Sequence, residues 1–194
     1  MMWIGIALLA AAIAMGIWYR PGWGEGAKLC ALCAVMGVAG LAAGDGSALF
    51  TVLEALLRFP EVLAAAIPEL APLIGFDQHT PYHLYDVWGH TARAVAAIPA
   101  KPLLRWVMLL HDIGKPGRFT LDKTGTGHFK GHAALSAAMA EEILLRLAMP
   151  GAERKKAVQL IRWHDAPVRP ERAHLAFWLR TLPKEQFFRL LAVK

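Results

Sequence analysis

The chain has 194 residues, of which 56% are apolar and 19% are charged. This length suits one domain with a well-formed core, or a small domain with an additional segment, and the apolar content excludes an intrinsically disordered chain. The net charge of +6 is uneven: residues 1–100 carry 4 Lys/Arg against 7 Asp/Glu, whereas residues 101–194 carry 17 against 8. A basic second half favours a phosphate-bearing partner, although a solvated basic surface gives the same count.

The first 44 residues are the most apolar part of the chain. No charged residue occurs in residues 1–19 or in the Ala/Gly/Val-rich stretch 29–44. The first stretch is about long enough to cross a bilayer, and Trp3 and Trp18 lie near its ends, as interfacial aromatics do. Three interpretations stay open: one or two membrane helices, an apolar N-terminal helix, or the remnant of a lost domain. Cys30 and Cys33 form a single CxxC pair, for which packing is a better prediction than zinc binding.

The rest of the chain predicts an all-α domain with short connections. Apolar residues recur at helical spacing between Pro and Gly breaks, and no long strand alternation occurs. Residues 60–76 contain three prolines and predict short helices and turns, and residues 119–131 predict a loop with a short hairpin around Gly125. The longer helices are expected at residues 47–59, 84–98, 102–112, 132–148, 152–165, 171–182 and 184–193.

Histidines cluster at the predicted helix ends. Two of them are followed directly by aspartate, at His111-Asp112 and His164-Asp165. Imidazoles and carboxylates brought together by packed helices suit a first-row divalent metal ion. Adjacent residues on a regular helix point about 100° apart, so the break at Gly114 would let both members of the first pair reach one ion. The set of histidines at or beside helix ends comprises His90, His111, His128, His132 and His164.

The remaining histidines carry a plainer expectation. A lone histidine on a helix is more often exposed or hydrogen-bonded than a ligand, and this is the prediction for His79, His83 and His174. For His128, a loop residue and a phosphate contact both remain open.

The segments "GHTARAV", "LLHDIGKPGRFTLDKTGTGHFKGH" and "IRWHDAPV" resemble a known family. The pattern His…His-Asp-Ile-Gly-Lys is similar to the HD superfamily of metal-dependent phosphohydrolases. Together with "FPEVLAAAIPELAPLIGFDQHTPYHLYDVW", these segments resemble most closely the HD domain of bacterial CCA-adding tRNA nucleotidyltransferases. The resemblance covers roughly residues 46–194 and implies an HD-domain helical bundle, preceded here by one or two apolar N-terminal helices.

The resemblance implies a metal-ligand set, carried over position by position. His90, His111 and Asp112 match the motif ligands, and His132 and His164 match the extra histidines of two-metal HD sites. The ion would be Mn, Fe, Ni, Co, Zn or Mg. The family usually has one more aspartate in a late helix, whereas no Asp follows Asp165 in this chain. That Asp165 replaces it is our own hypothesis.

The resemblance also defines the expected domains. Residues 1–45 form an apolar N-terminal segment and residues 46–194 an HD domain that we expect to be truncated at its C-terminal end. The Gly-Ser and Asp-x-Asp motifs of the nucleotidyltransferase head have no counterpart in residues 1–45. The chain is therefore not expected to add nucleotides on its own.

The predicted function is metal-dependent hydrolysis of a phosphate ester on a nucleotide or RNA end, tRNA included. Asp112 would bridge the ions or orient the water, and Lys115 would neutralise charge on the phosphoryl group. The alternative is a non-catalytic RNA-binding module, or a gene fragment, with a vestigial site. A cytoplasmic location is expected, with membrane association possible through residues 1–44, and the oligomeric state is open. The predicted phosphate or RNA contacts are Arg118, His128, Lys130, Arg154, Lys155 and Lys156.

Overall fold

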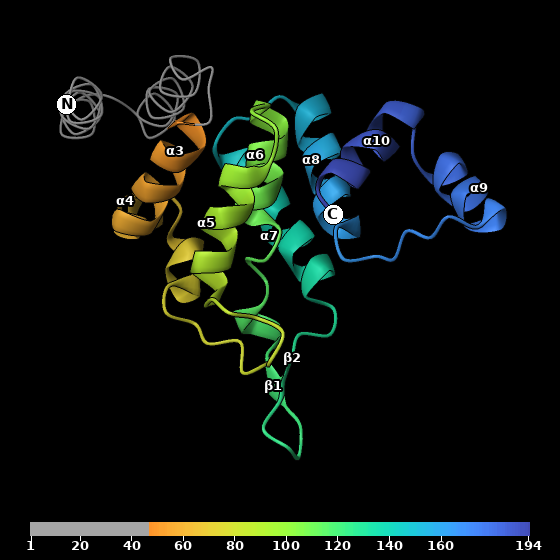
Figure 1. Ribbon diagram of the computed structural model, residues 1–194. Helices are drawn as coiled ribbons and strands as arrows, with labels where there is room; N and C mark the ends of the chain where they lie inside the picture. The colour runs from red at the N-terminus through yellow and green to blue at the C-terminus, as the bar shows by residue number, and fades with distance from the viewer. Residues whose placement is uncertain (1–46) are drawn as a thin grey trace.

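Helices make up most of residues 47–194, the part of the chain that our computed structural model describes (Figure 1). The all-α prediction is confirmed, and within these residues the only strands are β1 (Thr120–Leu121) and β2 (Gly127–His128). The predicted N-terminal helices, the domain boundary at residue 45 and the CxxC pair lie outside the described residues. The helical elements are α3 (Ser47–Arg58), α4 (Pro60–Ala66), η1 (Pro68–Leu73), α5 (Val87–Ala97), α6 (Pro102–Leu110), η2 (Pro116–Arg118), α7 (His132–Arg146), α8 (Gly151–Trp163), α9 (Arg172–Thr181) and α10 (Lys184–Ala192).

No helix in residues 47–194 has the length and apolarity needed to cross a membrane. The candidate membrane segment 1–44 lies outside this range and stays a prediction.

The start of α5 differs from the sequence expectation. A start at Leu84 was predicted, but the helix begins at Val87 and Leu84 is exposed. The side chain of Asp86 accepts a hydrogen bond from the backbone N–H of Gly89 at 2.6 Å, as an N-cap residue does. The apolar Leu84 therefore belongs to the preceding loop, and the cap sets the boundary.

The four helices α5, α6, α7 and α8 lie between α3 and α4 on one side and α9 and α10 on the other (Figure 1). Helix α6 packs against α5 and α8, and α7 packs along α8. These helices bury one apolar face each, which removes hydrocarbon from water and drives the packing. The core includes Val107, Leu110, Ile143, Leu144, Leu160 and Ile161, all at most 1% exposed.

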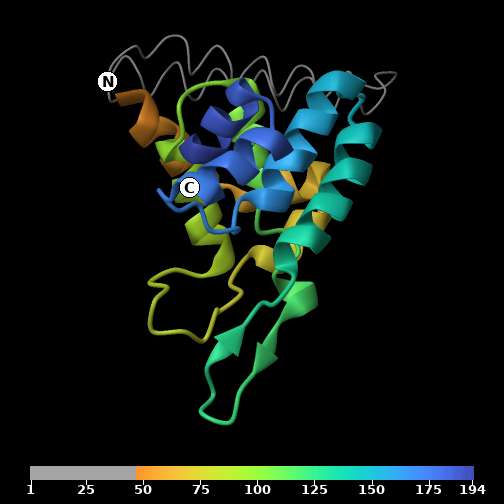
Figure 2. The same ribbon diagram turned by 90° about the vertical axis from the view of Figure 1, so that its right-hand side faces the viewer.

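The predicted hairpin around Gly125 is present and projects from one end of the bundle (Figure 2). Gly125 adopts a φ of +81°, a backbone conformation that glycine reaches without a steric cost. The hairpin contacts the loop of residues 77–86, because the N–H of Gly127 donates to the carbonyl of His79 at 2.7 Å. In sequence the hairpin joins the end of α6 to the start of α7, so both helix ends face this side of the molecule.

Candidate metal centre

The apolar helix α6 ends directly at the His111-Asp112 pair. His111 is the C-cap residue of α6, and the side chains of the pair are only 4% and 2% exposed. Gly114 then lets this turn lie against the start of α7: a Cβ on it would come 2.7 Å from the backbone nitrogen of Ser136 and 2.8 Å from the carbonyl oxygen of His132. The N–H of Gly114 also donates to Ser136 Oγ at 2.9 Å. Two polar side chains are thus held rigidly inside the bundle.

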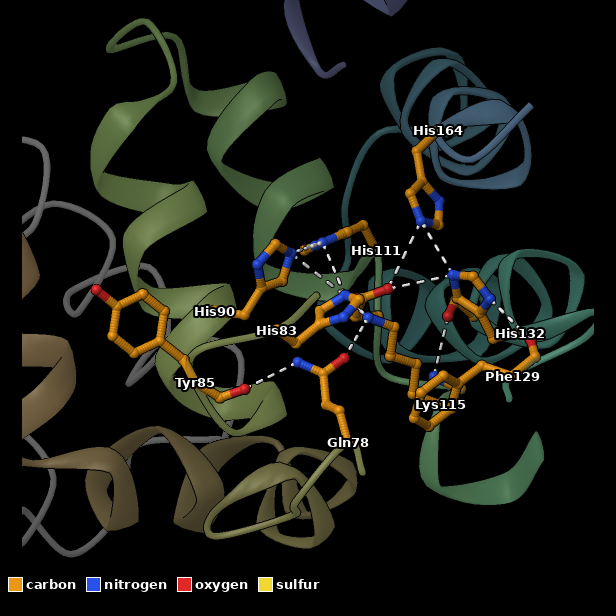
Figure 3. Close-up of polar contacts among 12 residues, drawn as sticks. Gln78, His83, Tyr85, His90, His111, Lys115, Phe129, His132 and His164 are labelled. Carbon is orange, nitrogen blue, oxygen red and sulfur yellow. Dashed lines mark hydrogen bonds and ion pairs between the residues drawn. The ribbon is translucent and has the colours of Figure 1, made fainter. Parts of the chain in front are cut away.

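Four histidines from four different elements point toward one another inside the bundle (Figure 3), and each has its Nε2 within 3.6 Å of a carboxylate oxygen of Asp112. His90 lies in α5, His111 at the end of α6, His132 at the start of α7, and His164 directly after α8. Their Nε2 atoms meet in pairs, His90 with His111 at 3.2 Å and His132 with His164 at 3.2 Å. The structure therefore brings together these four predicted ligands.

Asp112 lies between the two histidine pairs. Its Oδ2 is 3.5 Å from Nε2 of His90 and 3.1 Å from Nε2 of His111. Its Oδ1 is 3.3 Å from Nε2 of His132 and 3.6 Å from Nε2 of His164. Each oxygen completes a three-residue group that could hold one ion, with Asp112 shared between the groups.

Backbone carbonyls fix the orientation of three of the imidazoles. Nδ1 of His111 lies 2.6 Å from the carbonyl oxygen of Met108, and the corresponding distances are 2.9 Å for His132 with Phe129 and 2.7 Å for His164 with Ile161. A carbonyl only accepts, so in the neutral ring Nδ1 carries the proton and Nε2 presents a lone pair toward Asp112. This is the outer-shell support that metal-binding histidines commonly have.

The titration behaviour follows from burial and from these contacts. Burial by itself raises the pKa of Asp112, but His111, and then His132 and His164, outweigh it and hold this pKa well below its usual range. Burial, and next the charge of His111, lower the pKa of His90 to about 4, so its imidazole is neutral at pH 7. Burial lowers the pKa of His132 but Asp112 outweighs it, and the net pKa is raised.

The arrangement fits a divalent cation on three grounds. Oδ1 of Asp112 is buried and has no hydrogen-bond partner, which is costly unless an ion or a proton satisfies it. In the His132–His164 pair both Nδ1 atoms are held by backbone carbonyls, so the two neutral rings turn Nε2 lone pairs toward each other, and a positive charge between them would relieve that repulsion. Two nitrogens bound at about 2.0–2.1 Å to one tetrahedral ion lie roughly 3.3 Å apart, close to the 3.2 Å observed in both pairs.

Lys115 is the buried cation of the site and is 6% exposed. Its Nζ lies 2.8 Å from Oδ2 of Asp112 and donates to Oε1 of Gln78, also at 2.8 Å. Gln78 in turn donates to the carbonyl oxygen of Tyr85 at 3.0 Å, and the ring of Phe129 lies 5.3 Å from Nζ. Lys115 is therefore held on the carboxylate rather than extended into solvent.

A cavity of about 910 Å³ opens onto the ligand set. Besides the ligands and Lys115, it is lined by the loop residues Thr80, Tyr82 and His83, by small apolar residues of α5, and by residues 126–131. His83, expected to be an ordinary histidine, thus lies in the cavity wall. Gln78, Tyr82 and Phe129 were not singled out from the sequence.

The other predicted contacts are placed around the cavity or away from it. Asp165 is exposed and lines the cavity, but it belongs to neither metal-binding group, so its role as a ligand stays a hypothesis. Nε2 of His128 lies 2.9 Å from Oδ2 of Asp122, and Lys130 lines the cavity. Arg118 is exposed on η2.

The basic residues early in α8 are partly paired with acids. Arg154 donates to Glu141 at 2.8 Å and Lys156 to Glu153 at 2.7 Å, while Lys155 is exposed. Their predicted contact with RNA remains a prediction.

Residues 81–186 match the profile of the HD domain family, which spans more than half of the chain and contains all five ligand candidates. The chain belongs to the HD domain family. The A-adding tRNA nucleotidyltransferase of Deinococcus radiodurans is 38% identical to it over 130 residues, or 58% of this chain and 30% of that protein. The CC-adding tRNA nucleotidyltransferase of Thermus thermophilus is 36% identical over 132 residues, or 64% of this chain and 30% of that protein.

A further relative has a name that gives a different activity. The bifunctional uridylyltransferase/uridylyl-removing enzyme of Ruegeria pomeroyi is 30% identical over 124 residues, or 57% of this chain and 14% of that protein. This HD domain chain thus spans less than a third of the length of each of these three relatives. No solved structure was found to match it.

Proposed function

We propose that this HD domain is a metal-dependent phosphohydrolase that acts on a phosphate ester of a nucleotide or an RNA end. The observation that carries the proposal is the buried carboxylate of Asp112, whose Oδ1 has no hydrogen-bond partner and faces two imidazoles. A hydrolase of this kind needs a carboxylate that can hold an ion at the wall of a cavity, and the proposal is supported because Asp112 belongs to both groups that could hold an ion and lines a cavity of about 910 Å³.

A divalent cation bound there would supply Lewis-acid activation of a phosphoryl oxygen and would lower the pKa of a coordinated water. The residues of the chain would do the rest. Asp112 and the four histidines would hold the ions, and the carbonyls of Met108, Phe129 and Ile161 would keep three rings oriented. Lys115 would keep the Asp112 carboxylate in one orientation and add positive charge where a phosphate enters.

The cavity supports a nucleotide-sized substrate. Its volume of about 910 Å³ lies within the usual range of small-ligand sites, roughly 300–1,000 Å³. Lys130 and Lys194 line it and would attract a phosphate, while Tyr82, 87% exposed at its wall, offers a ring on which a base could stack. Two of the relatives are named as tRNA nucleotidyltransferases, which favours an RNA end over other phosphate esters.

The deciding experiment compares His111→Ala with the matched control His174→Gln. Nothing places His174 at the cavity, and its ring contacts the carbonyl of Pro167 and the indole N–H of Trp178. We expect His111→Ala to lose bound metal and to lower hydrolysis of a generic phosphodiester by more than about 100-fold, the upper end for loss of a residue that merely supports a ligand. The control should keep both. Retained activity in His111→Ala would contradict the proposal.

A non-catalytic RNA-binding module is the second candidate. It is supported by the basic composition of residues 101–194, 17 Lys/Arg against 8 Asp/Glu, although Arg154 and Lys156 are already paired with acids. Binding of a tRNA by wild type should then weaken steeply with salt, because each phosphate contact releases counterions. A metal-free protein with salt-dependent binding and no hydrolysis would favour this candidate over the enzyme.

A further inference from the structure

We propose that the two halves of the metal centre are unequal, and that Lys115 makes them so. In this scheme the half formed by His132, His164 and Oδ1 of Asp112 takes up the first ion tightly. The half formed by His90, His111 and Oδ2 fills only at a higher metal concentration. The inference rests on the proposed metal centre, but not on its hydrolytic activity.

The first argument is the position of the Lys115 ammonium. It contacts Oδ2 of Asp112 at 2.8 Å, and Gln78 fixes it there from the other side. An ion in the His90–His111 half would have to share this oxygen with an ammonium group and would be repelled by its positive charge. Because Lys115 and Gln78 are both buried, water screens this repulsion poorly.

The second argument is that the other carboxylate oxygen of Asp112 does not contact an ammonium group. Oδ1 of Asp112 is buried and has no hydrogen-bond partner. Its desolvation cost is already part of the folded state. Its neighbours at 3.3 and 3.6 Å are Nε2 of His132 and Nε2 of His164, which would themselves be ligands, so an ion that binds Oδ1 competes with no lysine ammonium. The His132–His164 half therefore starts with a free acceptor, whereas the other half starts with an acceptor in use.

The third argument is preorganisation of the histidines. The side chains of His132 and His164 are each 9% exposed, and both rings are held through Nδ1 by backbone carbonyls. The side chain of His90 is 39% exposed, and nothing in residues 47–194 gives its Nδ1 a hydrogen bond. Fixing the ring of His90 on metal binding costs conformational entropy, whereas the rings of His132 and His164 are already fixed before the ion binds.

These three differences all favour the same half. The proposal therefore makes a specific claim about the order of metal uptake, and about Lys115 as the residue that positions the carboxylate and suppresses the second step.

The test is a titration of the metal-free protein with Co²⁺, followed by visible absorption and by calorimetry. Wild type should show two steps whose dissociation constants differ by at least about tenfold, the scale on which groups around a metal site change its affinity. His90→Ala should remove the weak step and keep the tight one. His164→Gln should remove the tight step.

Lys115→Met carries the second part of the test. It should tighten the weak step by about tenfold and leave the tight step within about threefold, since only Oδ2 loses a partner. Lys101→Met is the control, because Lys101 is exposed at the start of α6 and should leave both steps unchanged. Circular dichroism and thermal unfolding confirm that each variant is folded, and His132→Gln is the second variant for the tight step.

The outcomes separate the two proposals. Two steps of equal affinity, loss of the tight step in His90→Ala, or an unchanged weak step in Lys115→Met would each overturn the inequality while leaving the metal centre in place. A wild-type protein that binds no Co²⁺ would instead overturn the metal centre itself.

Discussion

Two aspartates of this domain each lie against a histidine, and the difference between them is instructive. Asp112 is 3.1 Å from Nε2 of His111 in the bundle, and Asp122 is 2.9 Å from Nε2 of His128 in the hairpin. In the hairpin the carboxylate is exposed and accepts hydrogen bonds from the backbone and hydroxyl of Thr124 and from the N–H of Thr126. The hydrogen-bonding capacity of this carboxylate is thus met largely within its own turn.

The carboxylate in the bundle is the opposite case. Asp112 is 2% exposed, and one of its oxygens has no hydrogen-bond partner. A histidine next to an aspartate is therefore not enough to indicate a metal site. The stronger indication is a buried acceptor without a hydrogen-bond partner that lies among imidazole nitrogens able to hold an ion.

The largest expected effect comes from neutralising Asp112, and the same change at Asp122 is its control. Asp112→Asn keeps the shape of the side chain but removes the charge that both ligand groups share, whereas Asp122→Asn changes only the hairpin turn. We expect the first variant to lose bound metal and at least about 100-fold in hydrolysis, and the second to keep both. Metal analysis and a phosphodiester assay measure the two effects, and equal losses in both variants would remove the distinction between the sites.

Metal removal should reveal the same contrast in stability. A ligand present at about 100 times its Kd adds roughly 2.7 kcal/mol to the free energy of unfolding. For a domain of this size that corresponds to about 5–10 °C in Tm. A chelator should lower the Tm of wild type and of Asp122→Asn by this amount but leave Asp112→Asn unchanged. A chelator effect in Asp112→Asn would place the ion elsewhere.

Two glycines allow the packed turn after α6 to be compared with the open turn of the hairpin. A Cβ on Gly114 would press on the backbone of α7, so Gly114→Ala should cost about 1–3 kcal/mol in unfolding free energy and weaken metal binding. A Cβ on Gly125 meets nothing within 4 Å, but its φ of +81° makes Gly125→Ala strained by about 1 kcal/mol, without effect on the metal. Urea denaturation and Co²⁺ titration report the two quantities. Weakened metal binding in Gly125→Ala would contradict the separation.

The smallest expected effect concerns the titration of the hairpin. The hydroxyl of Thr124, and next His128, hold the pKa of Asp122 well below its usual range. Because this folded-state pKa is depressed, the associated stability is present above the unfolded pKa and is lost as the pH falls through the folded value. Thr124→Ala should raise the pKa toward the usual value, which carboxylate ¹³C NMR measures across a pH series. An unchanged pKa of Asp122 would show that a group other than Thr124 is responsible for lowering it.

Much of the fold was predictable because helix breaks are local. Pro102 and Pro150-Gly151 mark the starts of α6 and α8, and the hairpin follows from Gly125. The start of α5 was misplaced because Leu84 matches the apolar spacing, while the cap that decides the boundary is Asp86.

The candidate site was also predictable only in part. The histidines at or beside predicted helix ends formed a candidate set that included His128, and the resemblance to the HD superfamily selected the four ligand candidates from it, together with Asp112. Gln78, Tyr82 and His83 could not be selected. The contact of Gln78 with Lys115, and the places of Tyr82 and His83 at the cavity, depend on the loop of residues 77–86 folding back against the hairpin. Such a contact joins segments far apart in the chain, and no local pattern encodes it. The sequence offered one hint that this loop belongs to a site, which is that His and Tyr each occur twice in the segment "HTPYHLY".

The origin of the four histidines in four separate elements has a consequence for the unfolded chain. Ions bound in the two ligand groups, which share Asp112, would together tie α5, α6, α7 and α8 to one another, much as a cross-link does. A cross-link of distant segments restricts the unfolded ensemble for as long as it stays intact, and more so for longer loops. The metal-loaded chain should therefore keep these four segments near one another even after the helices have melted, and complete unfolding would require release of the ions.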